Sequence, residues 1–145
     1  MTRLRRATAK DGPAIRRMIL RERLDPTSIH WQNFLVAEED GQIVGIGQVK
    51  PLRGCRELGS LVVLPAYRGR GIAARLISAL EAEAGLPLYL LCRDRMEPYY
   101  RRFGFRRISF FAAPVALKLK LLPVLPFRLF GLRVIVMVKE QESAT

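Results

Sequence analysis

Apolar and polar residues follow one another along the chain with two different periods, and each change of period marks a new element. Apolar residues recur at helical spacing in residues 11–25 and 72–84, which predicts two amphipathic helices. Pro13 suits the first turn of the first helix, and Gly85 ends the second. Two further stretches predict short helices or turns, at residues 28–34 and 96–103.

Runs rich in aliphatic and β-branched residues predict strands between these helices. They cover residues 3–8, the two arms of a hairpin within 34–50, and residues 56–64, 86–92, 104–111 and 132–139. Asp40-Gly41 is a preferred two-residue hairpin turn. This order predicts an α/β fold in which about six or seven strands form a mixed sheet with helices on both faces. The middle strand–helix–strand unit should be parallel.

Length and charge limit the classes of protein that the chain can belong to. A chain of 145 residues predicts a single domain over residues 1–145, and a hydrophobic content of 50% argues against disorder. The net charge of +12 predicts an anionic partner, which could be nucleic acid, membrane phosphate or a phosphorylated small molecule.

The two cysteines carry little functional information. Cys55 and Cys92 show no metal-ligand spacing, so no metal is expected. No secretory signal is visible at the basic N-terminus. Together these features predict a reducing, cytoplasmic location.

The stretch AYRGRGIAARLI, residues 66–77, has its charges reversed relative to the helix that begins there. Arg68, Arg70 and Arg75 crowd the helix start, where cations cost stability because that end is already partly positive. Backbone N–H groups of a glycine-rich turn before a helix bind anions, so the arginines make sense if the ligand is a polyphosphate. The alternative is a tight turn with solvated arginines.

Two nucleotide-binding motifs fit this stretch poorly. A Walker-type loop requires a lysine that is missing, and the dinucleotide fingerprint requires a third glycine where Ala74 stands. Instead, LVVLPAYRGRGIAARLI resembles the acetyl-CoA-binding segment of the GNAT superfamily of acetyltransferases. The pattern [Arg/Gln]-x-x-Gly-x-[Gly/Ala] is met by Arg68, Gly71 and Ala73, and PYYRRFGF resembles a later block of the same superfamily. The resemblance covers roughly residues 3–111 and the last strand.

The resemblance implies a GNAT fold and an N-acetyltransferase. Such an enzyme moves the acetyl group of its co-substrate acetyl-CoA directly to a primary amine in a ternary complex. Backbone N–H groups of the turn would hold the pyrophosphate; these belong to Arg68, Gly69, Arg70, Gly71, Ile72 and Ala73. The preceding strand would pair with the pantetheine arm through the backbone of Leu61, Val62 and Val63, while its side chains pack in the core.

The resemblance also implies two catalytic residues. Tyr100 takes the position of the tyrosine that protonates the departing thiolate, and a phenol is protonated at pH 7. Glu57 takes the position of a glutamate that accepts the proton of the amine directly or through water. Glu38, Glu39 and a chain of water molecules are the alternatives to Glu57. The asparagine that many members carry before the tyrosine helix is absent, because that region reads CRDRMEP.

Residues 112–131 form an apolar and basic insertion before the last strand, longer than the usual connection. The run ALKLKLL alternates like an edge strand, although Pro123 and Pro126 prevent a long regular element. Three interpretations stay open: a lid or specificity wall at the acceptor site, a homodimer surface, or a peripheral membrane contact. We expect burial against the domain or a second subunit.

A second function remains open beside the enzyme. The same fold could serve as a non-catalytic module that binds coenzyme A or presents a basic surface. The acceptor amine, whether a small molecule, a peptide or a protein, is not named by the sequence. The basic stretches lack interleaved aromatic residues, so no specific nucleic acid is expected.

Overall fold

Seven strands form a mixed sheet in the order β1-β2-β3-β4-β5-β7-β6, which confirms the predicted fold class. The computed structural model describes residues 1–141. Contacts divide the chain into two compact units: Met1–Lys50 with Leu58–Ala84, and Pro51–Glu57 with the chain from Gly85 onward. The strand β4 (Cys55–Val63) contributes residues to both units. One domain over residues 1–145 stays a prediction.

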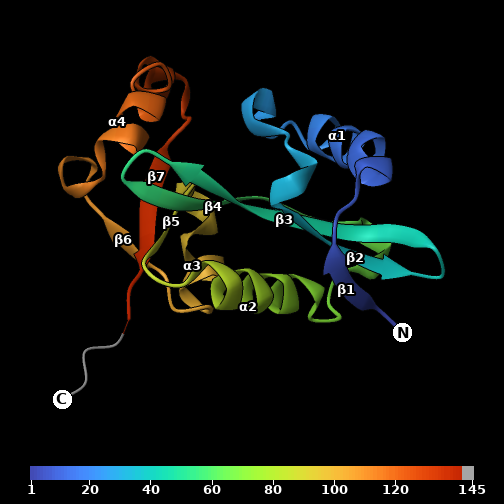
Figure 1. Cartoon of the computed structure of the whole chain (residues 1–145). Helices are drawn as coiled ribbons and strands as arrows, with labels where there is room; N and C mark the ends of the chain where they lie inside the picture. Colours follow the sequence, from blue (N-terminus) through green and yellow to red (C-terminus); the bar gives the residue numbers. More distant parts are fainter. Residues whose placement is uncertain (142–145) are drawn as a thin grey trace. The chain divides into compact units, whose positions relative to one another are not determined.

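The first unit contains three antiparallel strands besides its part of β4 (Figure 1). These are β1 (Arg3–Arg6), β2 (Phe34–Glu39) and β3 (Gln42–Leu52), whose last two residues belong to the second unit. The hairpin between β2 and β3 turns at Asp40 and Gly41, whose φ angles of 51° and 77° are both left-handed. This is the geometry of the predicted two-residue turn, so the hairpin prediction is confirmed.

The helix α1 (Gly12–Arg21) covers one face of this unit. Its side chains Ile15, Met18 and Ile19 are buried, as the helical spacing predicts. They pack with buried residues of the strands: Ala7, Phe34, Val36, Ile46 and Val62. The helix ends four residues earlier than predicted, because Arg23 adopts a left-handed φ of 54°.

The helix α2 (Ile72–Ala84) matches the predicted residues 72–84 and lies on the other face of the same strands (Figure 1). Two glycines of β3 allow it to approach closely. A Cβ atom at Gly45 would lie 3.2 Å from Ile72 and 3.3 Å from Leu76, and one at Gly47 would lie 3.1 Å from Leu80. Larger residues at these two positions would therefore push the helix away from the sheet.

The second unit is built on β5 (Leu88–Arg93), β6 (Arg106–Ile108) and β7 (Val134–Lys139). β7 runs antiparallel to both β5 and β6. β5 runs parallel to β4, with Glu57 opposite Tyr89, as predicted for the middle strand–helix–strand unit. β6 is shorter than the predicted 104–111, because the Ser109 hydroxyl accepts a hydrogen bond from the Ala112 N–H at 3.2 Å and begins a 3-10 turn.

Two helices of the second unit lie against opposite faces of its strands. Side chains along a strand alternate between faces. On β5, Leu91 packs with α4 (Val115–Leu121), whereas Cys92 lies on the other face, near Tyr100 of α3 (Glu97–Arg101). None of the helices in residues 1–141 is both long and apolar enough to cross a bilayer.

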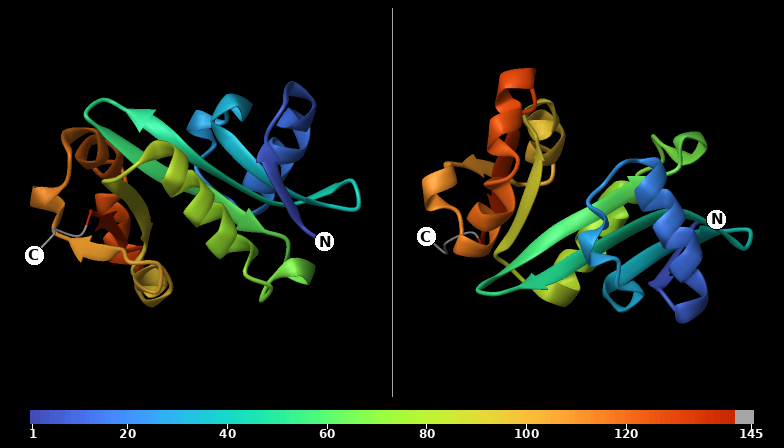
Figure 2. Two further views of the ribbon diagram at one scale, coloured as in Figure 1. Left: turned by 60° about the horizontal axis from the view of Figure 1, so that its bottom comes forward. Right: turned by 90° about the horizontal axis from the view of Figure 1, so that it is seen from above.

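The edge strand suggested by ALKLKLL is wrong, because these residues form α4. Leu117 and Leu121 lie four residues apart and are both buried, which is the spacing of one helix face. They pack with Ala113 and with Val136 of β7. The 3-10 helix η7 (Leu125–Phe130) follows, and Figure 2 shows both elements in the orange-to-red part of the chain. The expected burial against the domain therefore applies to one face of α4.

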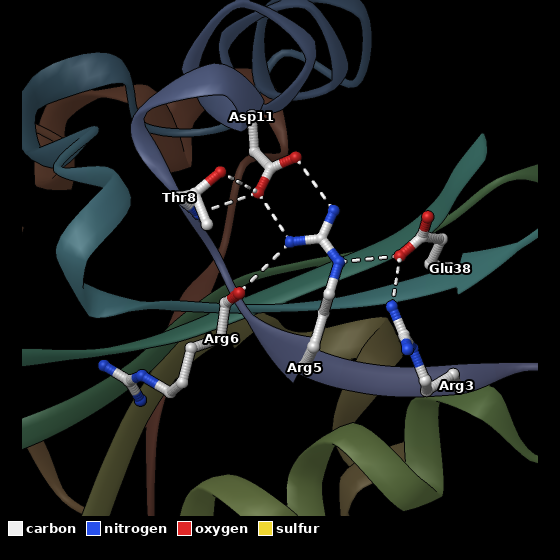
Figure 3. Close-up of polar contacts among 6 residues, drawn as sticks. All are labelled: Arg3, Arg5, Arg6, Thr8, Asp11 and Glu38. Atoms are coloured by element: carbon white, nitrogen blue, oxygen red, sulfur yellow. Dashed lines mark hydrogen bonds and ion pairs between the residues drawn. The ribbon is translucent and has the colours of Figure 1, made fainter. Parts of the chain in front are cut away.

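A network of ion pairs joins β1 to β2 and to the turn before α1 (Figure 3). The Arg5 guanidinium donates two hydrogen bonds to Asp11, at 2.8 and 3.0 Å, and one to Glu38 at 2.7 Å. The backbone N–H of Thr8 donates to Asp11 at 2.7 Å. Asp11 is buried, and its hydrogen bonds with Arg5 lower the pKa of its carboxyl from 3.8 to about 2.

We expect Asp11→Asn to destabilise the protein by about 2 kcal/mol at pH 7. A carboxyl whose pKa is lowered on folding stabilises the folded state above its ordinary pKa, and this contribution is lost as the pH falls through the lowered value. The difference between wild type and variant should therefore shrink between about pH 4 and pH 2. Urea denaturation at several pH values measures it, and a constant difference would contradict the assignment to this carboxylate.

Candidate functional site

The turn that precedes α2 contains two glycines in the left-handed region. Gly69 and Gly71 adopt φ angles of 81° and 77°, which favour glycine strongly over other residues. No atom lies within 4 Å of a Cβ built at either glycine, so open space faces the loop at both positions. The first N–H groups of a helix lack intrahelical partners. A polyphosphate in this space would meet backbone donors and the positive end of the helix.

The arginines of this loop already have partners in the protein. The Arg68 Nε donates to the carbonyl oxygen of Val63 at 3.0 Å. Arg70 lies 3.5 Å from Glu39 and stacks over the ring of Tyr67 at 5.0 Å. Their side chains are still about half exposed, at 56% and 53%. The reversed charges are thus partly compensated inside the first unit, by contacts that the sequence did not reveal.

The predicted pantetheine strand carries a local distortion immediately before Leu61. Ser60 has a φ of 53°, which is uncommon for a residue other than glycine. Its hydroxyl accepts a hydrogen bond of 2.8 Å from the amide of Gln48, a fully buried side chain of β3. A left-handed residue inside a strand redirects the N–H and C=O groups that follow it. This feature had no signal in the sequence, since serine is unremarkable in a strand.

Tyr100 lies on α3 in the second unit, with its ring held between two aromatic neighbours. Ring centroids lie 5.1 Å from Tyr99 and 6.2 Å from Phe105, both in edge-to-face geometry. Burial raises the pKa of the Tyr100 phenol above its ordinary value of 10, and Cys92 adds to the effect. Among residues 1–141 the hydroxyl has no hydrogen-bond partner. The phenol is therefore protonated at neutral pH and available to donate to a ligand.

Glu57, the predicted base, is buried in the second unit and bound to the insertion. Its side chain is only 5% exposed, and its two oxygens lie 2.7 and 3.3 Å from the Nζ atom of Lys120 on α4. Both carboxylate oxygens of Glu57 are in contact with the Lys120 ammonium. Glu57 can therefore take part in proton transfer only if Lys120 shifts or if water carries the proton. The sequence predicted neither this partner nor the burial.

The alternative bases are also engaged in ion pairs. Glu38 is held by Arg5 and Arg3, and its hydrogen bond with Arg5 lowers its pKa. Glu39 lies near Arg70 and the N-terminus. Within residues 1–141 no group of three histidine, cysteine or acidic side chains could hold a metal ion.

The predicted site residues divide between the two units. Those predicted to bind the cofactor belong to the first, and the two predicted to be catalytic belong to the second. Glu57 and Tyr100 make no hydrogen bond with each other in the described part of the second unit. Their roles stay predictions.

We expect Lys120→Met to destabilise the protein by about 3 kcal/mol, because it leaves the buried Glu57 carboxylate without its cation. Lys118→Met is the matched control, since Lys118 lies two residues away on α4 with no ion pair in residues 1–141. Its effect should stay within about 0.5 kcal/mol. Urea denaturation of both variants checks this; equal losses would show that the pair contributes little.

Solved structures of acetyltransferases share this fold. The chain is similar to N-acetylglutamate synthase from Neisseria gonorrhoeae, solved with coenzyme A and N-acetyl-glutamate, at 22% identity and a TM-score of 0.77. That match covers 97% of this chain but only 35% of the synthase. Rv2747 from Mycobacterium tuberculosis, solved with CoA, also gives 22% identity and a TM-score of 0.77, over 96% of this chain and 99% of that one.

A third similar structure is an acetyltransferase of the GNAT family from Staphylococcus aureus. It is 15% identical, with a TM-score of 0.73 over 97% of this chain and 99% of that one. A comparison with curated protein sequences gives no match. Residues 30–107, more than half of the chain, match the family described as acetyltransferase (GNAT) domain. This range contains the loop before α2 and Tyr100, and the chain belongs to the GNAT acetyltransferase family.

Proposed function

We propose that the protein is an N-acetyltransferase that moves the acetyl group of acetyl-CoA to a primary amine by direct transfer in a ternary complex. The observation that carries this is the loop before α2, where two left-handed glycines leave open space at the start of a 13-residue helix. The loop lies within the matched family domain. Coenzyme A in the similar structures from Neisseria and Mycobacterium is consistent with it.

The residues of the loop fit the pyrophosphate of coenzyme A. Backbone N–H groups from Arg68 to Ala73 would bind it, and Gly69 and Gly71 leave room for its approach. Arg68 and Arg70 are half exposed and could turn toward phosphate oxygens. The backbone of Leu61 to Val63 would pair with the pantetheine arm.

Acetyl-CoA supplies a thioester carbonyl for attack by the amine. The overall reaction of an ammonium substrate releases one proton, because the amine loses two and the coenzyme A thiolate takes one. Tyr100 would donate its hydroxyl proton or a hydrogen bond to the departing thiolate. Since its pKa is raised, the phenol stabilises the thiolate chiefly as a hydrogen-bond donor. Glu57 would accept a proton of the amine through water.

The first expected result concerns the cofactor. Acetyl-CoA should raise the thermal midpoint of the wild type in a saturable way, and Gly71→Glu should abolish the shift, because its carboxylate would fill the loop and repel phosphate. Gly41→Glu is a matched control. It has the same φ of 77°, the same open surroundings and the same charge change, but it lies in the β2–β3 hairpin. It should retain the shift.

If millimolar acetyl-CoA does not raise the thermal midpoint of the wild type, the proposal of an acetyl-CoA-dependent enzyme is wrong. A shift that Gly41→Glu also loses would mean that strain or charge, rather than the loop, decides binding. If acetyl-CoA shifts the thermal midpoint but no amine causes the release of coenzyme A thiol, the result would favour the second candidate, a non-catalytic module that binds coenzyme A.

The second expected result concerns Tyr100. With the best acceptor from a panel of amino acids, polyamines and peptides, Tyr100→Phe should lower kcat about 100-fold and leave the KM for acetyl-CoA unchanged. Thiol release measures the rate. The thermal midpoint should stay the same, because the hydroxyl bonds to nothing in residues 1–141. A wild-type kcat in the variant would exclude Tyr100 as the acid.

A further inference from the structure

Most of the large apolar side chains that are exposed in residues 1–141 lie in the insertion or directly before it. Ten large apolar side chains of residues 1–141 are markedly exposed, and eight of them lie within residues 111–130. We call these eight the apolar surface: Phe111, Val115, Leu119, Leu122, Leu125, Phe127, Leu129 and Phe130. Large exposed apolar side chains that gather in one part of a protein mark a candidate interaction site.

On α4, the apolar surface lies on a helix whose other face is already buried. On α4, Leu117 and Leu121 pack in the core of the second unit, whereas Val115 and Leu119, also four residues apart, lie on another face of the helix. In η7, Leu129 and Phe130 are 90% and 86% exposed. The core therefore fixes α4 and leaves its second apolar face toward the outside, whereas none of the residues of η7 is buried.

The same part of the chain is rich in lysine and arginine. Residues 98–139 contain nine lysines and arginines and no aspartate or glutamate. The nine are Arg101, Arg102, Arg106, Arg107, Lys118, Lys120, Arg128, Arg133 and Lys139. Some are paired with carboxylates outside this stretch, as Lys120 is with Glu57. Neither Arg128 nor Arg133 forms a side-chain ion pair within residues 1–141.

A cavity of about 630 Å³ lies next to this surface in the second unit. Its lining includes Arg107, Arg128 and Arg133 together with apolar side chains of the insertion and β7, and Asp94 is its one carboxylate. Phe111 and Leu125 belong to both the cavity and the apolar surface. Arginines beside exposed apolar side chains match a ligand with an anionic phosphate group attached to hydrocarbon.

The charge of this surface distinguishes between two possible partners, a second copy of the chain and a lipid bilayer. In a symmetric dimer the same patch meets itself, so Arg128 and Arg133, which form no ion pair within residues 1–141, would face cations of the second copy with Asp94 as the one carboxylate of the cavity beside them. A bilayer with anionic lipids supplies both phosphate and hydrocarbon at one interface. We propose that α4 and η7 dock on the surface of a membrane containing anionic phospholipids, with the apolar surface entering the boundary of headgroups and acyl chains and the arginines binding phosphate.

The test is co-sedimentation of the full-length protein with vesicles, without acetyl-CoA, so that its result is independent of the enzymatic assignment. Vesicles of phosphatidylcholine alone are compared with vesicles that also contain phosphatidylglycerol. We expect binding to the anionic vesicles that weakens steeply as salt rises, and at least about tenfold weaker binding to phosphatidylcholine alone.

Two variants address the two parts of the surface. Leu129→Ser/Phe130→Ser should weaken binding at least about tenfold, because the inserted apolar area is lost. Arg128→Gln/Arg133→Gln should weaken it by about fivefold for each cation removed. The matched controls lie on α1: Leu20→Ser removes a side chain that is 57% exposed, and Arg16→Gln/Arg17→Gln removes the same charge. Both controls should bind like the wild type.

Several outcomes would overturn the proposal. The first is the absence of binding to either kind of vesicle. The second is an equal loss in the α1 controls, which would indicate general charge attraction. The third is a dimer in sedimentation velocity that Leu129→Ser/Phe130→Ser dissociates, without vesicle binding. The fourth is that the protein binds polyglutamate as tightly as vesicles and that Leu129→Ser/Phe130→Ser leaves the binding of polyglutamate unchanged. An unchanged circular dichroism spectrum would confirm that each variant is folded. If Leu129→Ser/Phe130→Ser does not fold, Arg128→Gln/Arg133→Gln still tests the surface independently.

Discussion

A carboxylate buried at the start of a strand needs a cation, and in this protein the cation comes from an element 63 residues away in sequence. Glu57 is the last residue of the part of β4 that belongs to the second unit, and Lys120 reaches it from α4. Removing one partner of such a pair costs much more than exchanging both, because a lone buried charge remains. The insertion is therefore an integral part of the second unit, fixed by this pair and by the burial of Leu117 and Leu121.

The fold could be predicted from the sequence wherever the pattern was local. Residues 72–84 had apolar positions at helical spacing and a terminating glycine, and α2 has these bounds. Asp40-Gly41 specified its hairpin turn, because both residues tolerate the left-handed region. The pattern failed at α4, where alternating lysines and leucines imitate a strand. Only the contacts with β7 and Glu57 show that Leu117 and Leu121 share one helix face.

The candidate site was predictable to a similar extent. The motif located the loop before α2 because glycine spacing and arginines are visible in a single stretch of chain. The contacts that hold those arginines were not visible, since the carbonyl of Val63 and the carboxylate of Glu39 are brought near only by folding. Ser60 gave no signal at all, because serine is ordinary in a strand and its hydrogen bond from Gln48 on the neighbouring strand forms only on folding. Long-range pairs of this kind cannot be read from one sequence.

The Tyr100 hydroxyl, which bonds to no other group in residues 1–141, has a consequence for how this family can change over time. The ring is held by Tyr99 and Phe105, and phenylalanine would keep those contacts. Selection for a stable fold therefore acts on the ring and not on the oxygen. A lineage that no longer needed the role proposed for Tyr100 could lose the oxygen while its fold stayed intact. Under that proposal, descendants that bind coenzyme A without transferring its acetyl group would differ from active relatives by one atom.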